Sequence, residues 1–157
     1  MSAEHPSIVH VRRELGSRGA TGEIRVFAEP VRTAAAAAAA LGCSIGAIVN
    51  SLIFEADGGP VLILTSGAHR VDTAKVAAFL SVECLVKASP EYVREHTGQV
   101  IGGVSPVGHV KSIATYIDPW LQRHEAIWAA AGHPDAVFST TYEELLRMTD
   151  ATLLHVE

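Results

Sequence analysis

The residues best suited to chemistry lie in a glycine-rich segment, residues 97–109, with four glycines and one proline in thirteen positions. Glycine lacks a Cβ atom and reaches positive φ, so such a segment can bring its backbone close to a ligand. Its N–H groups can then receive an anion or the edge of a nucleobase. The same composition also suits an ordinary tight connection between a helix and a strand. Composition alone leaves both interpretations open.

Two further groups of polar side chains sit in or directly after apolar segments. Asn50 and Ser51 interrupt the apolar run 48–54, and we interpret Asn50 as facing a pocket. After the apolar run 61–64 the chain offers a hydroxyl, a flexible glycine, an imidazole and a guanidinium, from Ser66, Gly67, His69 and Arg70. Ligand sites favour such strand ends. For His69 and Arg70 a solvated turn is the alternative, and Asp72 is interpreted as a helix N-cap.

Several kinds of catalytic site are not predicted by the sequence. The eight histidines form no HxH, HxxH or HExxH pattern, so no metal and no other cofactor is expected. There is no GxSxG nucleophile elbow, no GxGxxG and no GxxxxGK[ST]. Cys43 and Cys84 lie far apart and are interpreted as two reduced thiols.

Length and charge bound the class of protein. The 157 residues, 48% of them hydrophobic, fit one domain over 1–157 with its own core. The net charge of -5 and only 12 Lys plus Arg argue against a grip on a long stretch of nucleic acid. No apolar run reaches the roughly 18 to 20 residues of a membrane span. The polar segment 1–6 does not resemble a signal peptide, so we expect a cytoplasmic protein without a membrane partner.

The elements that must position these residues alternate between helices and strands. Cap residues and apolar spacing predict helices that begin near Ser7, Thr33, Asp72, Ser89, Asp118 and Thr141. Short apolar runs predict strands at 24–26, 48–54, 61–64, 84–86, 113–117 and 136–138. The helix after Asp118 is expected to carry Ile127 and Trp128 and to stop at Gly132. A hairpin at 57–59 within this alternation indicates a mixed α/β fold, with a mixed sheet surrounded by helices.

Taken in order, these segments resemble the YbaK/ProX family, the free-standing relatives of the editing insertion in bacterial prolyl-tRNA synthetases. The resemblance covers residues 41–146 and rests on IVNSLIF, PVLILTSGAHRVD, TAKVAAFL, ASPEYVREHTG, GGVSPVGH and AAGHPDAVF. Residues 102–106 match the family's GxxxP loop. One such loop is weak evidence, whereas the ordered series is fairly specific.

The resemblance implies a single mixed α/β domain with a curved sheet and a metal-independent hydrolysis of mischarged tRNA. The 3′-terminal adenosine would lie against the GxxxP loop, with water attack helped by the substrate's own ribose hydroxyl. It implies catalytic roles for Asn50, Gly102 and Gly103. It implies substrate-binding roles for Ser51, Ser66, Gly67, His69, Arg70, Val104, Ser105, Pro106, Gly108 and His109. A synthetase or an elongation factor would present the aminoacyl-tRNA 3′ end.

One departure from the family concerns Asn50, where many members carry a lysine that is important for activity. Losing a charge-assisted hydrogen bond should cost about 1–3 kcal/mol, or roughly 5- to 150-fold in rate. The cations that could compensate are Arg70, Lys75, Lys87 and Lys111. The alternative to a deacylase is a non-catalytic module that binds an aminoacyl-tRNA end, a nucleotide or an amino-acid-like ligand. An unrelated small-molecule hydrolase on the same fold is a third hypothesis.

The deacylase and binding hypotheses require a cavity between the 102–106 bend and the Asn50 strand. The candidate lining residues are Ile24, Val26, Val49 and Leu64. His109 is expected to be structural rather than a proton relay. Trp120 and Trp128 are expected in the core rather than at an interface.

Overall fold

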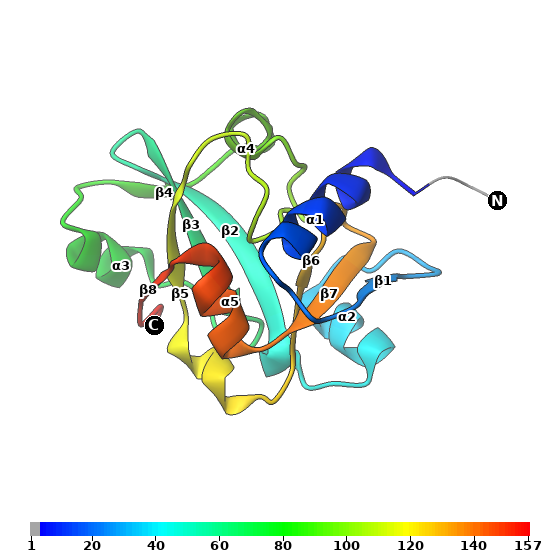
Figure 1. Cartoon of the computed structure of the whole chain (residues 1–157). Coiled ribbons are helices and arrows are strands. Elements are labelled where there is room, and N and C mark those ends of the chain that lie inside the picture. Colours follow the sequence, from blue (N-terminus) through cyan, green and yellow to red (C-terminus); the bar gives the residue numbers. More distant parts are fainter. Residues whose placement is uncertain (1–3) are drawn as a thin grey trace.

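A curved mixed sheet forms the centre of the protein in a computed structural model that describes residues 4–157 (Figure 1). Its strands are β1 (Ile24–Val26), β2 (Ile48–Ala56), β3 (Gly59–Ser66), β4 (Leu85–Lys87), β5 (Ala114–Ile117), β6 (Ile127–Ala130), β7 (Ala136–Thr140) and β8 (Thr152–Leu153). The helices are α1 (Pro6–Ser17), α2 (Ala34–Leu41), α3 (Thr73–Leu80), α4 (Pro90–Thr97) and α5 (Tyr142–Thr149), with short 3₁₀ helices η1 (Ile45–Ala47) and η2 (Pro119–Arg123). The described part of the chain thus has the mixed α/β architecture that the sequence predicts.

The strand order is β1-β7-β6-β2-β3-β5-β8, and β4 pairs with β2 outside this path. The long hairpin of β2 and β3 is antiparallel, and β4 is antiparallel to β2. In contrast, β6 runs parallel to β2, and β5 runs parallel to β3. Strand β2 is therefore central, and its neighbours on one side change along its length.

Helices cover both faces of this sheet. Alternate residues of a strand point to opposite faces, so Val49 and Ile53 of β2 join a core cluster with residues of α1 and α5. On the other face Phe54 packs with Val76 of α3, and Ile48 packs against α2. Figure 1 shows α3 on the opposite side of the strands from α1. The site residues are thus carried by a strand that is packed from above and below.

Local sequence signals explain where most helices begin and end. The side chains of four predicted caps accept a hydrogen bond from the backbone N–H three residues on: Thr33, Asp72, Ser89 and Thr141. Gly42 and Gly98 follow α2 and α4 in the left-handed conformation that favours glycine. These helices match the sequence prediction to within about two residues, the usual scatter of helix ends.

The prediction after Asp118 was wrong in one respect. Asp118 does cap a helical turn, but η2 ends at Arg123, and Ile127 and Trp128 belong to β6 rather than to the same helix. Ile127 and Ala129 are fully buried while Trp128 and Ala130 are partly exposed, which is the two-residue period of a strand. Pairing with β2 and β7 overrides the helix propensity of this alanine-rich stretch. Strand β8 was not predicted.

Residues 1–3 of the polar segment 1–6 lie outside the described range. Among residues 4–157, no helix combines the length and apolarity needed to cross a membrane.

Candidate functional site

The candidate site begins at a gap in the sheet beside β2. Strand β3 pairs with β2 from Val49 to Ala56 without a break. On the other side, β6 pairs only with Ile48 and Val49, and β4 pairs only with residues 54–56. The middle of β2 therefore faces no strand on this side, although it is held firmly by β3 on the other.

The gap leaves polar backbone groups without a strand partner. The Ile53 carbonyl accepts a hydrogen bond from the Ala88 N–H at 3.1 Å, and the Asp57 N–H donates to the Cys84 carbonyl at 3.0 Å. Backbone groups of alternate residues in a strand point to the same edge. The N–H and carbonyl of Ser51 therefore point into the gap, where neither β6 nor β4 reaches them. Among the described residues, the buried Ser51 Oγ also has no hydrogen-bond partner.

A cavity of about 200 Å³ occupies this gap. Its lining residues are Val49, Asn50, Ser51, Leu52, Ile53, Lys87, Val93, Ile101, Gly102, Val104 and Ala130. Most of these are apolar, and the polar side chains come from Asn50, Ser51 and Lys87. Small-molecule sites have this character, with an apolar wall and few polar groups that fix orientation. The cavity separates the glycine-rich loop from β2, which is where the sequence analysis required one.

The loop that closes the cavity is braced from within by Gln99, which is 3% exposed. Its Oε1 accepts a hydrogen bond from the Ser105 N–H at 2.6 Å. Its Nε2 donates to the carbonyls of Val107 and Gly108 at 3.3 and 3.4 Å. A buried side chain that hydrogen-bonds to several backbone groups of a loop fixes the shape of that loop. The hydrogen bonds of Gln99 therefore fix the shape of the loop from Ser105 to Gly108.

The two glycines of the bend have different physical roles. Gly102 lines the cavity at φ +86°, and a Cβ placed there would meet nothing within 4 Å. At Gly103 a Cβ would lie 2.6 Å from the His133 carbonyl carbon and 2.7 Å from the Pro134 nitrogen. Gly102 is needed for a backbone conformation that L-residues rarely adopt, whereas Gly103 is needed for close contact with the turn before β7.

The far end of the loop faces away from the cavity. His109 Nε2 donates to the Ser105 carbonyl at 2.6 Å, since a carbonyl can only accept. Burial lowers the pKa of His109, and the hydrogen bond to Ser105 opposes this only in part. Pro106, Gly108 and His109 line a separate polar hollow that also includes Arg18 and Lys111. His109 is therefore bonded to the loop and does not line the β2 cavity.

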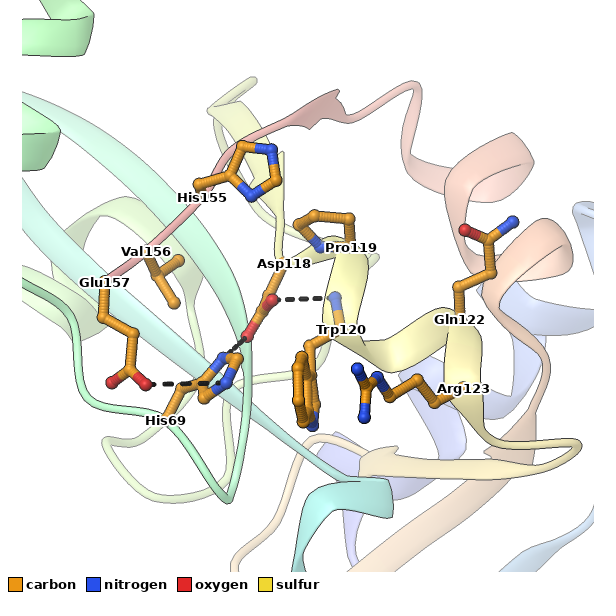
Figure 2. A pocket seen from close by; sticks show the side chains of 9 residues that line it. All are labelled: His69, Asp118, Pro119, Trp120, Gln122, Arg123, His155, Val156 and Glu157. Atoms are coloured by element: carbon orange, nitrogen blue, oxygen red, sulfur yellow. Dashed lines mark hydrogen bonds and ion pairs between the residues drawn. The ribbon is translucent and has the colours of Figure 1, made fainter.

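The His69 segment forms a second cavity, of about 400 Å³, at the ends of β3 and β5 (Figure 2). Here the buried carboxylate of Asp118 accepts hydrogen bonds from His69 Nδ1 at 2.7 Å, the Ser66 N–H at 3.1 Å and the Trp120 N–H at 2.9 Å. His69 Nε2 lies 3.5 Å from the Glu157 carboxylate. Figure 2 shows Trp120 between the imidazole ring of His69 and the guanidinium of Arg123.

The other predicted residues of this segment are also tied to the protein. Ser66 Oγ donates to the Gly46 carbonyl at 2.8 Å, and the residue is fully buried. A Cβ at Gly67 would lie 2.5 Å from the Ile45 carbonyl oxygen, so this glycine serves the packing of η1. The Arg70 N–H donates to the Glu157 carboxylate at 3.0 Å. None of these three residues lines the β2 cavity.

The structure therefore divides the predicted site residues into three groups. Asn50, Ser51, Gly102 and Val104 line one cavity, with Gly103 and Ser105 supporting its loop. The second group lies near the Asp118 cavity and consists of Ser66, Gly67, His69 and Arg70. The third group lines the polar hollow at the far end of the loop and consists of Pro106, Gly108 and His109. Of the candidate lining residues, only Val49 reaches the β2 cavity. Leu64 is fully buried in the core, and Ile24 and Val26 pair with β7.

Sequence reasoning missed several residues of the site. Val93 of α4, Ile101 of the loop and Ala130 of β6 line the cavity, but nothing in their types marks them as functional. Their position depends on which strands flank β2, and one sequence does not supply that. Gln99 carried a weaker signal, since a lone glutamine among glycines and apolar residues at a loop start suggests an internal brace.

Comparison with known proteins identifies the family. Residues 28–148 match the model of the aminoacyl-tRNA editing domain, and the chain belongs to this family. An uncharacterized protein of Bacillus subtilis, YwhH, is 29% identical over 140 residues, 88% of each chain. Proline--tRNA ligase of Bacillus licheniformis is 40% identical over 93 residues, which are 59% of this chain and only 16% of the ligase.

A solved structure extends the likeness to the whole fold. A protein described as a proposed trans-editing enzyme for prolyl-tRNA synthetase superposes with a TM-score of 0.93. It is 38% identical, and the match covers 99% of both chains. The resemblance to the YbaK/ProX family and the mixed α/β fold inferred from the sequence are thereby confirmed.

Proposed function

We propose that this protein is a trans-acting aminoacyl-tRNA deacylase that removes a wrong amino acid from the 3′ end of tRNA. The observation that carries the proposal is the β2 cavity, where an apolar wall meets the Asn50 side chain and the Ser51 hydroxyl, which has no hydrogen-bond partner among the described residues. Its membership of the editing-domain family supports hydrolysis of an aminoacyl ester. The likeness to a protein described as a trans-editing enzyme supports action on tRNA that another enzyme has charged.

In the proposed reaction, water adds to the ester carbonyl carbon and the bond to the ribose oxygen breaks. The proton lost by the water goes to the departing ribose oxygen, which leaves free amino acid and uncharged tRNA. The neighbouring ribose hydroxyl of the substrate helps the attack, so no metal or protein nucleophile is needed. The Asn50 amide orients the ester or a 3′-end phosphate, and the 102–106 backbone holds the terminal adenosine.

The net charge of -5 fits a protein that touches only the acceptor end of tRNA. A synthetase or an elongation factor would present that end, in the cytoplasm where tRNA is charged. The cavity volume of about 200 Å³ and its aliphatic lining favour small apolar amino acids over charged ones.

The proposal is tested by incubating the protein with tRNAs charged with alanine, valine, serine, cysteine and glutamate. We expect release of one or more small amino acids well above the uncatalysed rate, and no release of glutamate. Asn50→Ala should slow the reaction about 2- to 10-fold, because a neutral hydrogen bond contributes about 0.5–1.5 kcal/mol. Folded protein that hydrolyses none of these tRNAs would contradict the proposal.

The neutral side chain of Asn50 favours a second candidate, a non-catalytic module that binds the same tRNA end. Asn50→Lys separates the two. A deacylase already turns over as wild type, and the lysine changes its rate or its amino-acid preference. A binding module shows saturable binding of aminoacyl-tRNA without turnover in the wild type.

A further inference from the structure

The β2 cavity carries a single formal charge. Of the eleven residues that line it, Lys87 alone is charged, and no carboxylate is among them. The three other cations considered from the sequence lie elsewhere. Lys111 lines the hollow at the far end of the loop, the Lys75 ammonium donates to the Glu157 carbonyl, and Arg70, whose backbone N–H donates to the Glu157 carboxylate, does not line the β2 cavity. The structure thus distinguishes Lys87 from every other candidate.

The position of Lys87 is fixed by the pairing of β4 with β2. Lys87 lies opposite Phe54, and paired residues project to the same face of a sheet. Asn50 projects to that face too, because it precedes Phe54 by an even number of residues. The separation along the strand is roughly 13 Å, at about 3.3 Å per residue. Lys87 and Asn50 therefore mark the two ends of one cavity on the same face.

The side chain of Lys87 is free to bind a ligand although its backbone is held. The next residue, Ala88, is buried and donates its N–H to the Ile53 carbonyl at 3.1 Å. Among the described residues, the exposed Lys87 has no hydrogen bond or ion pair through its ammonium. Lys75, by comparison, donates to the Glu157 carbonyl at 2.6 Å. An unpaired ammonium at the mouth of an apolar cavity is suited to an anion.

The chemistry of the proposed substrate limits which anion Lys87 can bind. This step rests on the proposed function, in which the cavity holds an aminoacylated adenosine. The amino acid itself carries a cationic α-amino group that an ammonium repels, and the ester and nucleoside are neutral. The first anionic group outside the cavity is the phosphate on the 5′ side of the terminal adenosine. We infer that Lys87 binds this phosphate and anchors the 3′ strand as it enters the cavity.

The test compares Lys87→Gln with wild type on the best-hydrolysed aminoacyl-tRNA and on the matching aminoacyl-adenosine, which lacks the phosphate. We expect KM for the tRNA to rise about 5- to 10-fold, with a much smaller effect on the nucleoside ester. The slope of log KM against log salt should fall by about 0.7, the value for one phosphate contact on a single strand. Lys87→Arg should restore most of the loss, and Lys75→Gln is the matched control that should change neither measure.

An equal loss on both substrates, or an unchanged KM and salt slope, would overturn the inference. If the wild type hydrolyses nothing, the deacylase proposal fails and Lys87 is tested separately by titrating a labelled CCA trinucleotide. Weaker binding by Lys87→Gln, restored by Lys87→Arg, would then support the phosphate contact. Binding that is the same in wild type and Lys87→Gln, or absent from both, would refute it.

Discussion

The cavity beside Asp118 and the cavity beside β2 differ in how their polar groups are bonded. The larger one, beside Asp118, contains a buried carboxylate whose oxygens are occupied by His69, Ser66 and Trp120. The smaller one, beside β2, has the buried hydroxyl of Ser51 and the exposed ammonium of Lys87, neither of which has a partner within residues 4–157. Of these two cavities the first is the larger, yet its buried carboxylate already has partners within the protein.

Polar groups without a hydrogen-bond partner, rather than the number of charged residues, distinguish a ligand site from a structural network. A buried polar group without a partner is costly, so an unpaired one facing a cavity suggests a missing ligand. A carboxylate that accepts several hydrogen bonds from the protein instead stabilises the folded structure. Mutations at one cavity or the other test this distinction.

The largest effect is expected for Asp118→Ala, which removes the acceptor from the structural network. The backbone N–H groups of Ser66 and Trp120 would lose their partner in a site where Asp118 is only 2% exposed. We expect a loss of about 3 kcal/mol in the free energy of unfolding, measured by urea denaturation. Asp72→Ala is the matched control, since its carboxylate caps only α3 and its loss should cost about 1 kcal/mol.

Because Asp118→Ala risks failing to fold, His69→Gln tests the same distinction more gently. It removes the imidazole from Asp118 and leaves the carboxylate and its backbone partners in place. Deacylation per folded molecule should stay within about 2-fold of wild type if the Asp118 cavity is structural. A loss of activity in a stably folded His69→Gln protein would show that the Asp118 cavity takes part in the reaction.

A smaller effect, focused on the β2 cavity, is expected for Gly103→Ala. The added methyl group would meet backbone atoms of His133 and Pro134 at 2.6 to 2.7 Å, so the loop must move. Such overpacking costs about 1–3 kcal/mol, and we expect at least about a 10-fold fall in kcat/KM, as displaced groups lose their geometry. Gly102→Ala is the control, because its methyl group meets no atom and only the positive φ is strained. Equal activity of the two variants would contradict the role given to close packing at Gly103.

The fold was predictable from sequence to the extent that its signals are local. Caps at Thr33, Asp72 and Ser89 and the hairpin at 57–59 depend on neighbours a few residues away. Strand β6 was mistaken for helix because its identity depends on pairing with β2, in which Ile48 lies opposite Trp128. Long-range pairing overrides local propensity in such segments.

The same reasoning explains which site residues were found. The glycine-rich loop and Asn50 were recognised because their residue types are unusual in apolar surroundings. Ser66 and His69 were unusual in the same way, but their bonding partner, Asp118, is 49 residues beyond His69. Sequence showed that these side chains needed partners, whereas only the structure showed which ones already had them.

The smallest effect concerns the histidine that supports the loop from behind. Burial lowers the pKa of His109 below its ordinary 6.5, while Ser105 and Glu14 act to raise it and Arg18 and His10 to lower it. The unfolded chain therefore takes up a proton at a higher pH than the folded one. The stability that His109 contributes is complete above the unfolded pKa and is lost as the pH falls through the folded pKa.

His109→Gln keeps an N–H donor for the Ser105 carbonyl but does not titrate. Between pH 7.5 and 5.5, the urea midpoint of the wild type should fall more than that of the variant. Parallel falls would show that His109 titrates alike in both states, and that the loop is open to water on its far side as well as at the cavity.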